Sequence, residues 1–312
     1  MHNVSIILPC FNHGQYVAQA IESILSQTHK DFELIVTDDC STDNSLEVIN
    51  CLARTDSRIK VIRHDKNLGL PRSRNDGLQV ASGEFIAFCD SDDIWEPDKI
   101  QTQIESLVKH PDDDIVYCET LIIDQNGSLT GQHFSDLYPL PKNQFGWIFH
   151  ELVTCNFINV QSALMRRRCL KSVDHFDEDL RVLEDWWYWI QLARNHRFLY
   201  IPRALARYRI HSQSMSAMKK RSFPINRVKI YTRMLRKYTD ISCRAKADIF
   251  YSMGVDLAQI GKFRMAKRLL WKAVGLSTRG TINFNRLIKA MVRLTIISNP
   301  IQLSGHQHRQ GF

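Results

Sequence analysis

Long hydrophobic stretches are missing from this chain of 312 residues. No uninterrupted apolar run approaches the roughly 18 residues that a membrane-spanning helix needs, so no transmembrane segment is expected. Residues 1–10 carry neither a basic leader nor a long apolar core, so a secretory signal peptide is not expected either. Any contact with a membrane would therefore be peripheral, on its cytoplasmic face.

Cysteine pairs with a metal-binding or redox spacing are also absent. The eight cysteines include no CxxC pair and no Cys/His group at the spacing of a zinc site. Several lie inside apolar runs, as buried free thiols commonly do. The pattern predicts a reducing, cytoplasmic environment, and no structural metal is expected.

Acidic residues are scarce towards the end of the chain. Residues 216–312 hold 20 Lys or Arg against only three acids and carry a net charge of +17, whereas residues 1–215 hold 21 against 30 and carry −9. A strongly basic segment suits an anionic partner such as a membrane surface, although solvated helix faces would account for it equally well. Because few aromatic residues alternate with these charges and no nucleic-acid-binding module is recognisable, no nucleic-acid partner is expected.

Strands and helices alternate in the first 120 residues. Apolar runs that suit buried strands lie between amphipathic helical patterns such as Val17 to Leu25, in which apolar residues recur at i, i+3 and i+4. This alternation predicts an α/β fold, with a mixed and mainly parallel sheet flanked by helices and a ligand crevice beyond the C-terminal ends of the strands. The change of charge divides the chain into an α/β domain of residues 1–215 and a basic helical extension of residues 216–312. The predicted strands are Val4–Leu8, Phe32–Thr37, Ile59–Arg63, Glu84–Cys89 and Ile115–Cys118.

The segment Asp90-Ser91-Asp92 directly follows the fourth predicted strand. Two carboxylates one residue apart on a turn can both reach a hard divalent cation, which prefers oxygen ligands and keeps positions open for phosphate oxygens. In a reaction of a sugar nucleotide, such a cation would neutralise the diphosphate as it leaves. The structural alternative is that these residues cap the helix that begins near Pro97.

Asp38 and Asp39 end the second predicted strand and would face the same crevice. Like charges placed together cost stability unless they are solvated or paired, and ligand recognition would explain them. One of the two carboxylates could accept the N3–H of a uracil-type base. An Asx turn followed by a helix cap is the structural alternative.

Arg72 and Arg74 lie at the start of a predicted helix that begins near Pro71. The helix dipole and the free N–H groups of a first helical turn favour anions, so either arginine could hold a phosphate group. An exposed arginine on a solvated turn is the alternative for whichever side chain points away from the crevice.

Glu184 and Asp185 open a predicted helix that is rich in tryptophan and extends to His196. Acids in a first helical turn often only complement the helix dipole. A carboxylate flanked by aromatic side chains is, however, partly desolvated, which raises its pKa towards the value that suits a general base. The tryptophans also suit core packing, and at least one of them is expected there.

His211 stands directly after the last predicted strand, in the segment Tyr208-Arg209-Ile210-His211-Ser212. A lone histidine is usually structural. At this place in the chain, His211 could also serve as a third ligand of a metal or of a diphosphate.

Taken together, these segments resemble glycosyltransferase family 2, the inverting enzymes with the GT-A fold. Five blocks match in the family's order over about residues 4–215, which is far more specific than any one motif, and the basic extension is not covered. Cys40 departs from the pattern, since glycine or asparagine is more usual there. The blocks are Val4–Asn12, Ile21–Thr28, Asp38–Asp43, Gly69–Gly77 with Ala81–Asp93, and Phe176–Glu178 with Glu184–Trp186.

The resemblance implies that an acceptor hydroxyl displaces the nucleotide at the anomeric carbon of a nucleotide sugar, with inversion and with UDP as the expected nucleotide. Asp185 would be the catalytic base, and the acceptor would be a glycan or a lipid-linked molecule, as in bacterial-type polysaccharide or glycoconjugate assembly. A Mn²⁺ or Mg²⁺ ion would be held on the diphosphate by Asp90, Asp92 and His211. The implied donor-binding residues are Pro9, Phe11 and Asp39 around the base, and Arg72, Arg74, Asp90 and Ser91 towards the diphosphate.

The alternative function is a non-catalytic sugar-nucleotide-binding or regulatory protein of the same fold. The presence of Asp90 and Asp92, expected to bind the metal, and of Asp185, expected to act as the base, argues against it. In the basic extension, Gly254, Ala266 and Ala273 fall at the spacing of a tetratricopeptide unit, which a plain helical hairpin would satisfy equally well.

Overall fold

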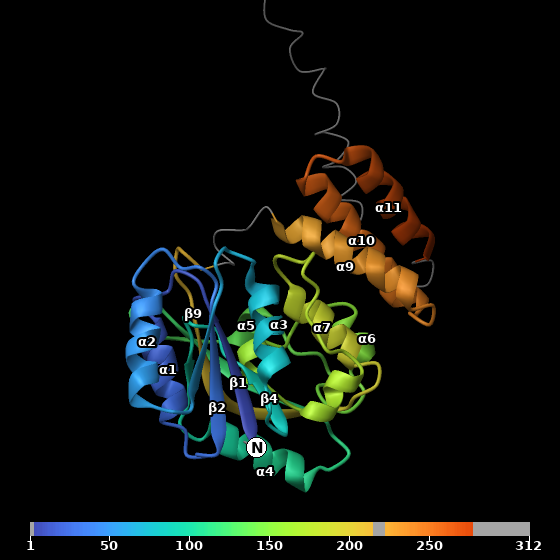
Figure 1. Ribbon diagram of the computed structural model, residues 1–312. Coiled ribbons are helices and arrows are strands. Elements are labelled where there is room, and N and C mark those ends of the chain that lie inside the picture. Colours follow the sequence, from blue (N-terminus) through green and yellow to red (C-terminus); the bar gives the residue numbers. More distant parts are fainter. Residues whose placement is uncertain (1–2, 215–221, 277–312) are drawn as a thin grey trace, which may run out of the picture. The chain divides into compact units, whose positions relative to one another are not determined.

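The computed structural model describes residues 3–214 and 222–276, and the chain separates into two compact units, Met1–Lys219 and Lys220–Phe312. The boundary expected between residues 215 and 216 lies outside the described residues. The first unit is an α/β domain, and the described part of the second is a group of helices (Figure 1).

Strands and helices alternate along the first unit, as predicted from its apolar pattern. The first helix buries one face formed by Val17, Ala20, Ile21 and Ile24. Most of the remaining elements are short. They are β1 (Val4–Cys10), α1 (Val17–Leu25), β2 (Phe32–Asp38), α2 (Ser45–Thr55), β3 (Ile59–Arg63), α3 (Leu70–Val80), β4 (Phe85–Phe88), β5 (Ile94–Trp95), α4 (Lys99–Lys109), β6 (Ile115–Ile123), β7 (Leu129–His133), α5 (Phe134–Leu137), α6 (Phe149–Leu152), η1 (Val160–Ser162), β8 (Ala163–Arg166), η2 (Arg167–Lys171), α7 (Glu184–Leu192) and β9 (Phe198–Arg209).

One mixed sheet forms the centre of the first unit, with the strand order β3-β2-β1-β4-β8-β6-β9-β5 and with β7 paired to β6. β3, β2, β1 and β4 run parallel to one another, and β6 runs parallel to β9. β8 is antiparallel to both β4 and β6 and joins the two parallel groups. The mixed sheet agrees with the predicted fold class. The fifth predicted strand is longer than expected, because pairing with β9 continues as far as Ile123.

Helices cover both faces of this sheet. Figure 1 shows α1 and α2 on one side of β1 and β2, and α3 on the other. Val4, Ile6 and Leu8 of β1 belong to the hydrophobic core that α1 completes. Between them, Ile7 faces α3, where a Cβ added to Gly77 would lie 2.6 Å from Ile7 Cγ2. Any larger residue at position 77 would therefore push α3 away from the sheet.

The second unit contains α9 (Ser222–Lys237), α10 (Cys243–Gln259) and α11 (Phe263–Leu276). α10 and α11 pack closely against each other at Gly254. A Cβ added to Gly254 would lie only 2.7 Å from Leu270 Cγ, so there is no room for a larger residue. Ala266 and Ala273 are fully buried in the same hairpin. The helical character expected of the extension is thus present in residues 222–276, and the close packing suits the small residues that the sequence places at these positions.

An ion pair ties α9 to α10. Arg227 Nε donates to Asp256 Oδ2 at 2.7 Å, and a second guanidinium nitrogen donates to Asp256 Oδ1. Asp256 is fully buried, so its partner is needed to offset the cost of burying the carboxylate. None of the helices in the described ranges is long and apolar enough to cross a membrane.

Candidate active site

Three strand ends bring polar loops together at one edge of the sheet. β1 and β2 are paired so that Cys10 lies opposite Asp38, and β4 is paired to β1 so that Phe88 lies opposite Ile7. Because these strands are parallel, the loops that follow them, residues 11–16, 39–44 and 89–93, emerge at the same edge. The two acidic clusters found in the sequence therefore lie at the same end of the sheet.

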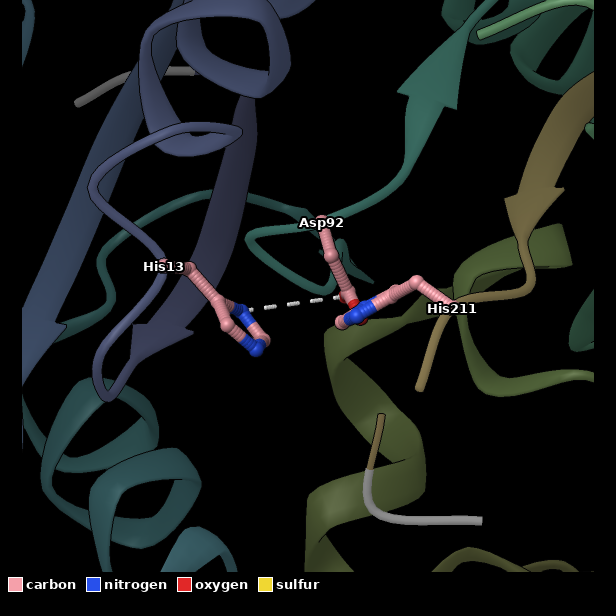
Figure 2. Close-up of side chains that lie close together, drawn as sticks. All are labelled: His13, Asp92 and His211. Atoms are coloured by element: carbon pink, nitrogen blue, oxygen red, sulfur yellow. Dashed lines mark hydrogen bonds and ion pairs between the residues drawn. The ribbon is translucent and has the colours of Figure 1, made fainter. Parts of the chain in front are cut away.

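Asp92 lies between two imidazoles, as Figure 2 shows. His211 Nε2 is 2.9 Å from Asp92 Oδ2, and His13 Nδ1 is 4.0 Å from Asp92 Oδ1. One donor atom from each of the three residues lies within 4.8 Å of the others. His211 Nδ1 is buried and has no hydrogen-bond partner among the described residues. Two imidazoles and a carboxylate whose donor atoms lie this close together fit a divalent cation.

The sequence indicated Asp92 and His211 but not His13, which lies in the loop between β1 and α1. The sequence could have indicated His13 as well. It follows β1, and because β1 runs parallel to β4 the loops after these two strands lie close together. Burial opposes the ionisation of Asp92, but the hydrogen bond with His211 and the nearby His13 outweigh it and lower the pKa of the carboxyl group. Asp92 is therefore held as a carboxylate, the form that binds cations.

Asp90 and Ser91 lie beside this cluster but face different partners. Ser91 is buried, and its Oγ is 2.8 Å from His13 Nδ1. Asp90 Oδ1 accepts a hydrogen bond from Arg74 at 2.6 Å. The residue that precedes α4 is Asp98, so the Asp90–Asp92 segment does not cap that helix. The helix-cap alternative is thereby removed.

Arg74 is buried rather than presented to a phosphate group. Its guanidinium donates to Asp90 at 2.6 Å and to Glu184 at 2.5 Å, and only 1% of the residue is exposed. Burial disfavours the charge, but the carboxylates of Asp90, Glu184 and Asp185 outweigh burial and raise the pKa of the guanidinium. The sequence suggested that Arg74 could hold a phosphate group; in the structure Arg74 links the loop after β4 to the start of α7.

Arg72 also has partners within the chain. Its Nε donates to Asp76 at 3.0 Å, and its Nη1 lies 3.7 Å from Glu178, while 45% of the side chain is exposed. The hydrogen bond and ion pairs described for Arg72 join it to Asp76 and Glu178, not to Asp92. The geometry matches the solvated helix turn that the sequence left open as an alternative for one of the two arginines.

Asp39 is buried and accepts hydrogen bonds from the loop that leads into α3. Its oxygens accept from the backbone N–H groups of Leu68 at 2.7 Å and Gly69 at 2.8 Å, and its Oδ1 lies 2.8 Å from His64 Nδ1. Contact with a nucleotide base would have to use the remaining acceptor capacity of the carboxylate. The other two residues expected around the base differ in exposure: Phe11 is 42% exposed, whereas Pro9 is buried within β1.

Asp185 lies in the first turn of α7 with few hydrogen bonds to its carboxylate. Oδ1 accepts from the backbone N–H of Trp186 at 2.7 Å, and Oδ2 accepts from Asn156 at 3.3 Å. Burial and the charge of Glu184 raise the pKa of Asp185 to about 7, against the opposing effect of Arg74. A carboxyl group that titrates near neutral pH suits a general base. As expected for core packing, the tryptophans of α7 are buried: Trp186, Trp187 and Trp189.

Backbone torsion angles single out the same region. Among the described non-glycine residues, φ is positive at Asn12 (55°), Cys40 (61°) and Leu183 (62°). These residues follow β1, follow Asp39 and precede Glu184. A left-handed conformation costs about 1–2 kcal/mol for a residue with a Cβ, and such strain concentrates at functional sites.

The fold is that of an α/β protein in which His13, Asp92 and His211, a group that could bind a cation, lie at the C-terminal edge of parallel strands. The carboxyl group of Asp185, on α7, has a raised pKa. The family model described as "Glycosyl transferase family 2" matches residues 5–171, more than half of the chain. The chain belongs to glycosyltransferase family 2 and is a glycosyltransferase with the GT-A fold. Family membership favours this enzyme over the non-catalytic alternative.

Relatives and a solved structure agree with this assignment. The chain is 31% identical over 222 residues to an uncharacterized glycosyltransferase of Methanocaldococcus jannaschii, covering 70% of this chain and 74% of the relative. It is 31% identical over 218 residues to the UDP-Glc:alpha-D-GlcNAc-diphosphoundecaprenol beta-1,3-glucosyltransferase WfgD of Escherichia coli, covering 69% and 80%. The mannosyltransferase PcManGT from Pyrobaculum calidifontis in complex with GDP-Man and Mn²⁺ matches with a TM-score of 0.60 and 16% identity, over 96% of this chain and 81% of that one. At that identity the likeness establishes the fold alone.

Proposed function

We propose that the enzyme transfers a sugar from a UDP-sugar to an acceptor hydroxyl with inversion at the anomeric carbon. The observation that carries the proposed catalytic arrangement is the ion-pair network through Arg74, which joins Asp90 to Glu184, the neighbour of Asp185. A base of raised pKa and the diphosphate-binding segment are thereby held in fixed orientation. Fixed orientation is what an in-line displacement needs.

In this mechanism Asp185 takes the proton of the acceptor hydroxyl through a carboxylate oxygen. The hydroxyl oxygen forms its bond to the anomeric carbon while the bond from that carbon to the diphosphate oxygen breaks. Asp92 and His211 would hold a divalent cation, Mn²⁺ or Mg²⁺, with Asp90 beside them. When bound, the cation neutralises the charge that develops on the leaving diphosphate.

The remaining residues position the donor in the proposed complex. Phe11 is exposed enough to cover one face of the base, and Asp39 can use its remaining lone pairs for the N3–H group. Pro9 shapes the strand end beneath them. Ser91 holds His13 through its hydroxyl group.

UDP and a lipid-linked acceptor are the proposed substrates. The support is the name of WfgD, which gives UDP-Glc as its donor and a diphosphoundecaprenol-linked sugar as its acceptor. The name of PcManGT gives GDP-Man, so the nucleotide has to be tested directly. The products would belong to polysaccharide or glycoconjugate assembly.

A panel of UDP-, GDP- and dTDP-sugars tests the proposal, with proton NMR of the product to establish the anomeric configuration. We expect turnover with a UDP-sugar, inversion, and loss of activity on addition of EDTA. Asp92→Ala should lose activity to the same extent, because a divalent cation typically supplies several kcal/mol of charge stabilisation. Full activity of Asp92→Ala in EDTA would show that no cation acts through this residue. Donor binding without turnover of any donor would support the non-catalytic alternative.

We also propose that the second unit docks on an anionic membrane surface, on the cytoplasmic face where lipid-linked acceptors are presented. The outer face of α11 combines basic and large apolar residues, as interfacial helices do. Met265 and Trp271 are each 56% exposed. The exposed basic residues of the same helix are Arg264, Lys267, Arg268 and Lys272.

Co-sedimentation with vesicles tests the docking proposal. Each Lys or Arg near an anionic surface contributes about 1 kcal/mol, so binding should require anionic lipid, weaken with salt and disappear when the chain is truncated after Met215. Trp271→Ala should weaken it, whereas Trp147→Ala, at an exposed tryptophan of the first unit, should not. Equal binding to neutral vesicles, or binding to neither kind, would reject the membrane role.

A further inference from the structure

Backbone hydrogen bonds hold the loop that carries His13 in its place. The His13 N–H donates to Ser45 Oγ at 2.9 Å. The His13 carbonyl oxygen accepts from the N–H groups of Tyr16 and Val17, both at 2.8 Å. These backbone contacts fix the loop, and the imidazole adds one hydrogen bond to them, between Nδ1 and Ser91 Oγ.

The imidazole of His13 is directed towards Asp92. Figure 2 shows His13 and His211 on either side of the Asp92 carboxylate. The centroids of the two imidazole rings are 5.8 Å apart, and the ring planes are inclined at 76°. Nδ1 of His13 lies 2.8 Å from Ser91 Oγ and 4.0 Å from Asp92 Oδ1, and 17% of the His13 side chain is exposed. The His13 side chain thus lies beside Asp92 and remains partly exposed to solvent.

We propose that His13 is a third protein ligand of the divalent cation held by Asp92 and His211, and that the two imidazoles make the site prefer Mn²⁺ or Co²⁺ to Mg²⁺. The inference rests on the cation site of the proposed function and adds a ligand and a metal preference to it. Mg²⁺ takes oxygen ligands and retains its waters. Imidazole nitrogen favours transition metals, whose affinities rise from Mn²⁺ to Co²⁺.

Titration calorimetry with each metal alone, without nucleotide, measures the preference. Wild-type protein should bind Mn²⁺ and Co²⁺ more tightly than Mg²⁺. His13→Asn should lower the affinities for Mn²⁺ and Co²⁺ by at least the roughly 10- to 100-fold that follows even from loss of an outer-shell partner. The affinity for Mg²⁺ should change less, because asparagine offers an oxygen in place of the nitrogen.

Pulsed electron paramagnetic resonance of the Mn²⁺-loaded protein counts the coordinated imidazoles. Two ¹⁴N couplings are expected in wild-type protein and one in His13→Asn. His110→Asn is the matched control, since His110 is exposed at the end of α4 and should leave both measurements unchanged. His13→Gln provides a second variant, and circular dichroism should show both His13 variants folded.

The outcomes separate this inference from the proposed function. If both His13 variants keep wild-type Mn²⁺ affinity and two imidazole couplings, His13 is only a hydrogen-bond partner of Ser91 and the inference is wrong. If Asp92→Ala nevertheless loses Mn²⁺ binding, the cation site of the proposed function is still supported. If Asp92→Ala and His211→Ala also bind Mn²⁺ as the wild type does, the cation site of the proposed function fails together with the inference.

Discussion

Two clusters of similar composition differ in how completely their polar atoms are paired. One cluster is His13–Asp92–His211 and the other is Asp114–Cys169–His196, and in each the donor atoms lie within 4.8 Å of one another. The second cluster is entirely buried. His196 Nδ1 is 2.7 Å from Asp114 Oδ2, and His196 Nε2 is 2.9 Å from Ser172 Oγ. The other carboxylate oxygen of Asp114 accepts a hydrogen bond from Arg168.

The first cluster leaves part of its bonding capacity unused. His13 Nδ1 lies 4.0 Å from Asp92 Oδ1, which is too far for a hydrogen bond, and 17% of the His13 side chain is exposed. The open contact between His13 and Asp92 therefore leaves room for a ligand, whereas hydrogen bonds close the second cluster. Residue types alone do not separate a structural cluster from a ligand-binding one. The degree of hydrogen-bond saturation does, and Asp114–Cys169–His196 is therefore assigned to stability.

The same substitution in each cluster gives the largest contrast. Asp92→Asn should reduce transfer roughly 10³-fold, because weaker cation binding removes several kcal/mol of transition-state stabilisation. Its free energy of unfolding in metal-free buffer should fall by about 1 kcal/mol, because Asp92 accepts a hydrogen bond from only one imidazole of the described residues, that of His211. Asp114→Asn should lower the free energy of unfolding by about 1–3 kcal/mol, since a charged acceptor of two groups becomes neutral.

Urea unfolding and initial rates per folded molecule measure both effects. Asp114→Asn should keep wild-type kcat and Mn²⁺ affinity at a temperature where it is folded. If Asp114→Asn lost Mn²⁺ binding, or if Asp92→Asn unfolded as readily as Asp114→Asn, the division between the two clusters would be wrong.

Asp185 extends the comparison to a carboxylate outside both clusters. Asp185→Asn should reduce transfer by roughly 10² to 10⁴, the usual contribution of a general base, and leave donor affinity unchanged. Because the pKa of Asp185 is about 7, kcat/KM of the wild type should rise with pH through that value. The pH profile and a donor titration test this. A donor affinity that fell in parallel with the rate would make Asp185 a donor ligand instead.

The raised pKa of Asp185 also has a consequence for stability. The folded chain holds this proton up to about pH 7, whereas the unfolded chain releases it near its ordinary value of 3.8. Stability therefore falls as pH rises between these values, and asparagine avoids that loss. Asp185→Asn should be more stable than wild type at pH 7.5 and nearly equal to it at pH 4. An unfolding curve with the same pH dependence in both proteins would contradict the assigned pKa.

Local sequence patterns predicted much of the first unit, residues 1–219. The strands that end at Asp38 and before Asp90 follow from buried apolar runs, and their parallel pairing follows from the helices between them. The meeting of these strand ends could therefore be expected before any coordinates. Cys40 was also informative, because its positive φ explains why glycine or asparagine is more usual at that position.

Contacts between distant parts of the sequence were not predictable in this way. The Arg74 contact with Glu184 spans 110 residues and depends on how α7 packs beside the loop after β4. A helix-start arginine looks the same in sequence whether it faces a phosphate or a carboxylate. Likewise, the hydrogen bonds from Leu68 and Gly69 to Asp39 depend on the path of a loop that carries no periodic pattern.

The smallest change in stability is expected at Cys40, where the backbone is strained. Cys40 has a φ of 61°, and its thiol makes only a long contact of 3.6 Å with the Asp65 carbonyl oxygen. Glycine removes the Cβ penalty of about 1–2 kcal/mol but adds about 0.5–1 kcal/mol of unfolded-state entropy. Cys40→Gly should therefore raise the free energy of unfolding by about 0.5 kcal/mol.

Cys51 supplies the matched control for this last prediction, because it is an exposed cysteine inside α2. There the same change to glycine should lower the free energy of unfolding by roughly 0.3–0.5 kcal/mol, since glycine is the poorer helix former. Cys40→Val should be destabilising, because a β-branched residue fits positive φ badly. Parallel urea unfolding of the three variants tests the signs. If Cys40→Gly and Cys51→Gly shifted stability in the same direction, strain at Cys40 would not be what distinguishes the loop after Asp39 from an ordinary helix.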